Sequence, residues 1–175
     1  MEPLAIFVLQ LVLSLSVFAL LAQWYIVPWL ATRSGHEGLI ALIFPHAFRH
    51  VGLAFLVPGL AADALPSSFA TAAAFGDLAS GLLALLALVA LRRRWSLAVP
   101  AVWLFNIVGT IDLLNALRHA EAVPYLAATW YIPTFFVPLL LVTHALVFVR
   151  LLDHARQPQS STRAAQGAAG LGSPQ

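Results

Sequence analysis

The segment PHAFRH, at residues 45–50, places three chemically active side chains inside an otherwise apolar run. His46 and His50 can transfer protons near neutral pH or bind a metal, whereas Arg49 keeps a permanent positive charge. On an α-helix, offsets of three and four residues place all three side chains on one side. The segment therefore predicts a polar site on one face of an apolar helix.

Two later segments supply candidate partners for this site. Asp77 lies in AAAFGDLASGLLA, and Asn106 and Asp112 lie in NIVGTIDLLN. A buried guanidinium is costly unless it is paired, so we expect Arg49 to form an ion pair with Asp77. The predicted ligand-binding residues are His46, Arg49, His50, Asp77, Asn106 and Asp112.

The two histidines also raise the possibility of a metal site, because residues four apart on a helix can present two imidazoles to one ion. One of the aspartates would complete a two-histidine, one-carboxylate set, which suits non-haem iron. The fixed charge of Arg49 opposes a cation there, and no HExxH motif is present. For a haem, His119 and His144 are expected at other depths than His46. We therefore expect no metal ligand, and the sequence identifies no cofactor.

The composition indicates which solvent surrounds these residues. The chain is 61% hydrophobic and 9% charged, whereas soluble domains carry about 25% charged residues. A bilayer core of about 30 Å needs about 20 apolar residues in a helix, and five runs of that length are present. They cover residues 3–30, 38–61, 69–91, 97–117 and 124–149. We therefore expect an all-α integral membrane protein, a bundle of five transmembrane helices.

Small side chains mark the third of these runs. Ala72, Gly76, Ser80 and Ala84 recur every four residues, which allows close approach of neighbouring helices. The pattern predicts that this helix lies at the centre of the bundle, with Asp77 facing protein.

The arginines predict the orientation of the helices. The net charge of +2 arises from nine arginines without lysine, and their scatter forms no basic face, so a nucleic-acid partner is not expected. Loops on the cytoplasmic side hold the excess of Arg and Lys. With five spans, seven arginines fall on one side and only Arg118 on the other. We expect a multi-pass protein of the plasma (inner) membrane with its N-terminus outside and its C-terminus in the cytoplasm.

The domain organisation is simple. Residues 1–154 form the predicted five-helix domain, and residues 155–175 read RQPQSS and onward, a polar segment that predicts a disordered cytoplasmic tail. The chain has no cysteine, which excludes disulfides and thiolate chemistry. The oligomeric state is left open.

These features predict a polar pocket between the second, third and fourth helices that opens outward. A central Arg in a membrane helix costs about 2.5–3.5 kcal/mol or more, which favours a functional role. We expect the pocket to bind a small lipophilic or anionic ligand, for transport or sensing, with Arg49 pairing an acidic group of the ligand.

Three alternatives are kept beside the haem or metal site at His46 and His50. The same groups suit a membrane-embedded acid–base enzyme acting on a lipid or isoprenoid substrate, and the sequence does not decide whether turnover occurs. The histidines and aspartates also suit a proton relay. Finally, the cluster is explained structurally if it only ties helices together, although polar contacts between membrane helices average only about 0.6 kcal/mol.

Overall fold

The computed structural model describes residues 2–170, with side chains through residue 153. All regular elements of this part of the chain are helical, and it contains no β-strand beyond one isolated bridge between Pro58 and Ala61. The elements in chain order are α1 (Pro3–Leu21), the π-helical turn η1 (Ala22–Ile26), α2 (Val27–Ala31), α3 (Gly35–Ile43), the 3-10 helix η2 (Phe44–Leu56), α4 (Ser67–Arg92), α5 (Ala98–Ala116), the 3-10 turns η3 (Ala120–Tyr125) and η4 (Ala127–Trp130), the π-helical turn η5 (Ile132–Phe136) and α6 (Val137–Gly170).

Joined end to end, these elements form five apolar helices that are long enough to cross a membrane. The shortest, Ala98–Ala116, has 19 residues and spans roughly 28 Å at about 1.5 Å per residue. The longest, Pro3–Ala31, has 29 residues. The prediction of an all-helical chain with five long apolar helices is confirmed.

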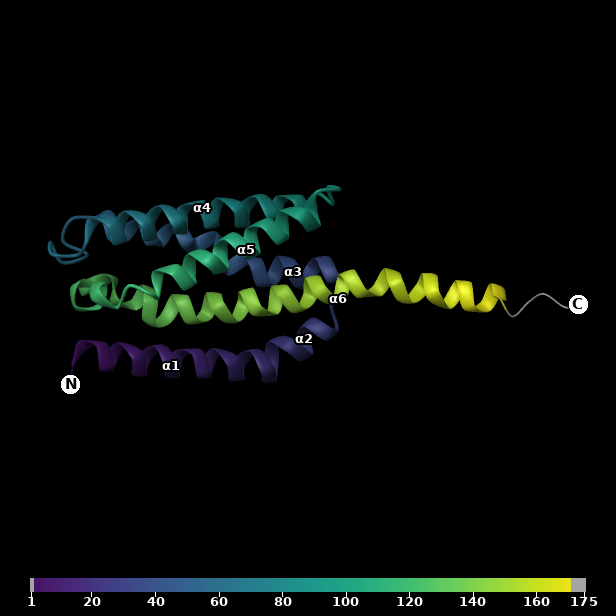
Figure 1. The fold of residues 1–175 in the computed structure, drawn as a ribbon, viewed down its shortest axis with the longest axis horizontal. Coiled ribbons are helices and arrows are strands. Elements are labelled where there is room, and N and C mark those ends of the chain that lie inside the picture. The colour runs from purple at the N-terminus through teal and green to yellow at the C-terminus, as the bar shows by residue number, and fades with distance from the viewer. Residues whose placement is uncertain (1, 171–175) are drawn as a thin grey trace, which may run out of the picture.

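The five helices run up and down beside one another (Figure 1). The N-terminus, the connection between η2 and α4, and the turns η3 and η4 lie at one end. The α2–α3 and α4–α5 connections lie at the other end, from which α6 continues outward. All arginines of the connections except Arg118 therefore belong to the same end of the bundle.

Proline shapes two of the helices. The π-helical turns η1 and η5 come just before Pro28 and Pro138, and the N–H of the preceding Val27 or Val137 donates to the carbonyl five residues back. A proline has no N–H, so the carbonyl four residues before it loses its helical donor, and the turn widens there. Both widened turns contribute residues to the walls of cavities.

The helix α4 packs against η2, α5 and α3 but not extensively against α1 or α6, and it lies at one side of the bundle (Figure 1). The prediction that it is the central helix is therefore wrong, although its small residues do line its contacts with neighbouring helices. Ser80 and Ala84 are completely buried. Ala72, the first residue of the predicted ridge, is exposed instead, so the ridge begins one turn later.

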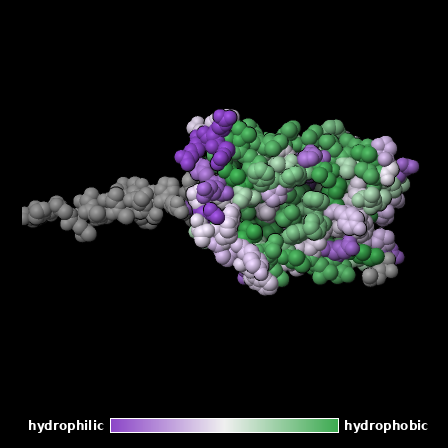
Figure 2. Space-filling view, turned by 180° about the vertical axis from the view of Figure 1, so that it is seen from behind, coloured by the Kyte–Doolittle hydropathy of each residue, from purple (hydrophilic) through white to green (hydrophobic). Residues whose placement is uncertain are grey.

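Two apolar clusters fill the two ends of the bundle and leave a polar layer between them. At the arginine-rich end, residues such as Leu42 and Phe105 of α3, α4, α5 and α6 pack together. At the other end, Phe55 and Phe69 pack against the turn η3 and against Phe7, the one buried residue of α1. The outer surface is a broad apolar belt with hydrophilic residues gathered at both ends (Figure 2).

The helix α6 runs beyond the fifth apolar span to Gly170, into the segment 155–175 that the sequence predicts to be a disordered tail. Residues 171–175 and the side chains from residue 154 onward lie outside the described part of the chain. The domain division at residue 154 therefore stays a prediction.

Candidate ligand site

The segment PHAFRH is wound as a 3-10 helix, which changes the face that each side chain occupies. With three residues per turn, residues three apart eclipse one another and a residue four apart is turned away by about 120°. The buried residues of η2 are His46, Arg49, Gly52 and Phe55, a stripe of period three. His50 is exposed, and its Nδ1–H donates to the carbonyl of Ala47 at 3.1 Å. The prediction that His50 shares the face of His46 and Arg49 is wrong.

The guanidinium of Arg49 is fully buried and is hydrogen-bonded to two neighbouring helices. Its Nε donates to Oδ1 of Asp77 on α4 at 2.7 Å, and its Nη1 donates to the carbonyl oxygen of Gly109 on α5 at 3.1 Å. Its Nη2 donates to the carboxylate of Asp112, also on α5. The predicted Arg49–Asp77 ion pair is confirmed, and Asp112 is a second carboxylate on the same guanidinium. One cation thus joins η2, α4 and α5.

Glycines make room for these polar side chains. A Cβ on Gly52 would lie 2.6 Å from Cβ of Asp77, and a Cβ on Gly76 would lie 2.7 Å from Cγ of Asp112. A Cβ on Gly109 would lie 2.9 Å from Nη1 of Arg49. Contacts this short force the neighbour to shift, so each helix carries a glycine where a charged side chain from another helix crosses it.

A second polar group lies next to the ion pairs, between η2, α5 and α6. His46 is hydrogen-bonded through Nε2 to Oγ1 of Thr143 at 2.9 Å. His144 is bonded through Nδ1–H to Oδ1 of Asn106 at 2.7 Å, and the Asn106 amide donates to the carbonyl of His144. The two imidazole rings are 4.1 Å apart between centroids. Asn106 thus holds His144 and does not contact Arg49.

The close approach of His46 and His144 corrects the expectation that they lie at different depths. The fifth span continues to Asp153 instead of ending at residue 149, so His144 is nine residues from that end. His46 is eleven residues from Gly35, the start of the second span at the same end of the bundle. Sequence reasoning missed His144 and Thr143, although a histidine inside an apolar helix is the same signal that identified His46.

The two-histidine metal alternative loses its geometric basis. His46 and His50 point to different sides of η2, so they cannot share one ion. Among residues 2–153, no group of three or more His, Asp and Glu side chains is arranged to hold a metal ion.

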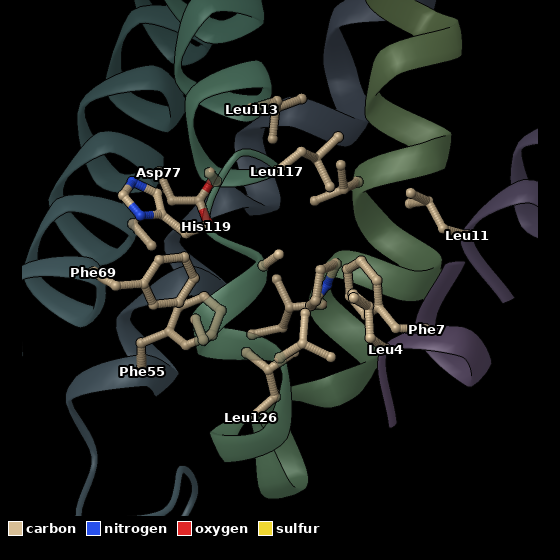
Figure 3. A pocket seen from close by; sticks show the side chains of 18 of the residues that line it. Leu4, Phe7, Leu11, Phe55, Phe69, Asp77, Leu113, Leu117, His119 and Leu126 are labelled. Carbon is tan, nitrogen blue, oxygen red and sulfur yellow. The ribbon is translucent and has the colours of Figure 1, made fainter. Parts of the chain in front are cut away.

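A cavity of about 210 Å³ lies beside the ion pairs, at the end of the bundle that holds the N-terminus (Figure 3). Its walls come from α1, η2, α4, α5, the η3 turn, η5 and α6, and most of them are apolar. Leu4, Phe7 and Leu11 of α1 lie across the cavity from Phe69 and from the polar groups (Figure 3). The sequence predicts a pocket between the second, third and fourth helices only, whereas this cavity is also lined by the first and fifth helices.

The polar part of the wall is acidic. Asp77 and Asp112 both line the cavity, and their side chains are 12% and 20% exposed, whereas the side chain of Arg49 is 0% exposed. The exposed fractions decide which group a ligand would meet: the carboxylates reach the cavity, and the guanidinium stays behind them.

A third titratable residue, His119, lies at the same end of the cavity as Asp77 (Figure 3). Its Nδ1–H donates to Oε1 of Glu121 at 2.7 Å, and this hydrogen bond holds the pKa of Glu121 below its ordinary value. The same bond orients the imidazole ring and leaves Nε2 as the ring nitrogen that is not bonded to Glu121.

A second, smaller apolar cavity of about 160 Å³ lies in the other half of the bundle, between α1, η1, α3 and α6. Thr143, the hydrogen-bond partner of His46, is in its wall. The layer of polar residues therefore lies between the two cavities and touches both.

The comparison with known protein families gives one match. A family model described as "Domain of unknown function (DUF8737)" matches residues 6–152, a stretch that covers nearly all of the five apolar helices, and the chain belongs to this family. No curated protein and no solved structure matches the chain.

Proposed function

We propose that the protein binds a small lipophilic molecule in the cavity beside Arg49, Asp77 and Asp112, as a step of transport or sensing. The observation that most directly supports this proposal is the cavity of about 210 Å³, which has apolar walls and two partly exposed carboxylates at one side. Ligand sites are typically concave and apolar, with a few polar groups that fix orientation. Because drug-sized sites measure about 300–1,000 Å³, this cavity suits a small molecule or one end of a longer chain.

The geometry favours a lipophilic ligand over an anionic one. Each of the three guanidinium nitrogens of Arg49 already donates a hydrogen bond, and the residue does not line the cavity. An anionic ligand in the cavity would meet Asp77 and Asp112 first, and like charges repel.

The proposal includes the setting of the protein in a membrane. Five apolar helices of sufficient length support a multi-pass protein of the plasma (inner) membrane. The gathering of arginines at one end of the bundle supports a cytoplasmic C-terminus and an N-terminus outside. In this orientation the cavity lies in the outer half of the membrane.

Single cysteines should report this orientation cleanly, because the chain has no cysteine of its own. Ser34 and Ser96 are exposed at the arginine-rich end, and Ser67 is exposed at the other end. We expect a membrane-impermeant thiol reagent to label Ser67→Cys in intact cells, and Ser34→Cys and Ser96→Cys only after permeabilisation. The reverse pattern would overturn the orientation, and labelling of all three from one side would contradict the spanning helices.

Filling the cavity should abolish binding. Ala73 of α4 lines the cavity, whereas the adjacent Ala72 is exposed and does not. We expect Ala73→Phe to release a lipophilic molecule that co-purifies with the unmodified protein, or to lower the affinity for a neutral fluorescent hydrophobic dye at least about tenfold. Ala72→Phe should bind as the unmodified protein does.

Binding is compared only among variants that are shown to be folded. Because overpacking costs about 1–3 kcal/mol, Ala116→Leu on α5 provides a second, smaller change in the same cavity. Equal binding by the unmodified protein and both filled variants would exclude the cavity as the ligand site.

Acid–base catalysis on a lipid or isoprenoid substrate is the second candidate, and His119 is the observation that favours it. A carboxylate orients one nitrogen of this imidazole, and the ring lines the same cavity as Asp77 and Asp112. Conversion of an added isoprenoid by the purified protein, lost in His119→Gln while dye binding is kept, would establish turnover. Binding without conversion leaves the first proposal in place.

A further inference from the structure

The cavity offers an excess of negative charge to whatever enters it. Among the residues that line it, the titratable ones are Asp77, Asp112 and His119. The two carboxylates face one guanidinium, so the cluster carries a net charge of −1 when both are ionised. In residues 2–153, Arg49 is the sole basic side chain within ion-pair distance of either carboxylate.

Each carboxylate still has acceptor capacity. Oδ1 of Asp77 and Oδ2 of Asp112 accept from Arg49, and within residues 2–153 the second oxygen of each accepts no hydrogen bond. A carboxylate in an apolar setting is costly unless its oxygens find donors, and a permanently unpaired charge costs more than a missing neutral hydrogen bond. A ligand with a positively charged donor group would supply both the charge and the hydrogen bonds.

The aromatic residues beside Asp77 favour the same kind of group. Phe55 and Phe69 line the cavity, packed edge to face with ring centroids 5.6 Å apart, and lie on the same side as Asp77 (Figure 3). The faces of aromatic rings attract cations, especially where water is excluded. Most of the remaining apolar wall, including Leu4, Leu113 and Leu117, is aliphatic.

We propose that the ligand is a cationic amphiphile: a protonated amine that binds between Asp77 and Asp112, attached to an apolar body that fills the cavity toward α1. This inference rests on the proposed function and names its ligand class. Asp112 is the more exposed carboxylate and makes the larger contribution to recognition of the ammonium group. The apolar body contributes affinity through burial against the leucines and phenylalanines of the walls.

The test compares three molecules of equal chain length: decylamine, decanol and decanoate. Each displaces the neutral fluorescent dye from the full-length protein in phosphatidylcholine nanodiscs, at neutral pH and constant ionic strength. Because charged and neutral amphiphiles partition differently into the lipid, each affinity is expressed as the ratio between the unmodified protein and Asp112→Asn. This ratio cancels the partitioning.

We expect the affinity for decylamine to fall about tenfold or more in Asp112→Asn, because a charge-assisted hydrogen bond to the amine is lost. The affinity for decanol should change less than about twofold, since it depends on the unaltered apolar walls. Asp77→Asn, which leaves Asp112 paired with Arg49, should show a selectivity change in the same direction but smaller, and serves if Asp112→Asn does not fold.

The possible failures separate the two proposals. If decylamine and decanol respond alike to both substitutions, the amine inference is overturned while lipophilic binding stands. If decanoate alone of the three displaces the dye, the inference is overturned in favour of an anionic ligand. If neither the dye nor any of the three molecules binds the unmodified protein, the proposed function itself fails.

Discussion

Replacing Arg49 with methionine should cost the protein about 3–5 kcal/mol of stability, the usual penalty for leaving buried charges without their partner. The substitution removes the one basic side chain that, among residues 2–153, is paired with the two carboxylates Asp77 and Asp112 in the middle of apolar helices. It also removes the donor to the Gly109 carbonyl. We expect strongly reduced folded yield in detergent, measured by size-exclusion chromatography, and a large drop in melting temperature.

The carboxylates should respond differently, because there are two of them. Asp77→Asn or Asp112→Asn alone leaves one carboxylate on Arg49 and a neutral pair, so each single change should alter the stability by less than about 1 kcal/mol. Changing both aspartates to asparagine leaves the guanidinium unpaired and should be about as damaging as Arg49→Met. The triple variant, with all three charges removed, should recover much of the loss.

This pattern separates a charge cluster from three independent contacts. If the three single substitutions are equally damaging and the triple variant shows their sum, charge balance does not govern the site. If the triple variant is stable and also binds the dye and decylamine as the unmodified protein does, the cluster only ties helices together and the proposed role in recognition fails.

Adding one methyl group to Gly76 should also destabilise the protein, although less than losing the arginine. A Cβ there would lie 2.7 Å from Cγ of Asp112, so the carboxylate would have to leave Arg49 or the helices α4 and α5 would have to separate. We expect the substitution to lower the stability by about 1–3 kcal/mol, the usual cost of overpacking. A fall in the melting temperature of the purified protein measures this loss.

Gly81 provides the matched control on the same helix. A Cβ there would meet its nearest neighbour, Cβ of Arg49, at 3.6 Å, an ordinary van der Waals contact. Because alanine favours helix formation over glycine by about 0.5–1 kcal/mol, Gly81→Ala should be neutral or stabilising. Equal effects of the two substitutions would contradict the close packing of Asp112 against Gly76.

Much of the fold could be predicted because apolar length is a strong signal. The five apolar runs of about 20 residues or more correctly predicted five helices. The cost of burying an unpaired Arg49 correctly predicted its ion pair with Asp77. Both predictions depend on the cost of burying charge or exposing apolar surface, which a sequence displays directly.

The face on which each residue lies was harder to predict. The α-helical period places His50 beside His46, but the 3-10 winding of η2 turns it out and leaves the stripe of His46, Arg49 and Gly52. Winding depends on how η2 packs against α4, and the residues of PHAFRH alone do not specify that contact.

The cavity itself could not be predicted from the sequence. Its walls combine residues from α1, α4, α5 and the η3 turn, which come together only through the tertiary arrangement. The first helix has no charged residue beside Leu4, Phe7 and Leu11, and the one polar neighbour, Gln10, did not by itself indicate a site. Likewise, the depth of His144 depended on where the fifth span ends, and this end lies four residues beyond the predicted residue 149.

The most direct measurement of the central claim is the location of a photoactivatable alkylamine bound to the protein in nanodiscs. After illumination, peptide mapping identifies the residues that carry the label. The cavity predicts label on its walls, at residues such as Phe7, Leu11, Leu113 and Leu117, and loss of that label in Ala73→Phe but not in Ala72→Phe. Label confined to the exposed outer face of the first helix, at residues such as Leu13 and Val17, and unchanged in Ala73→Phe, would show that the amphiphile only dissolves in the surrounding lipid.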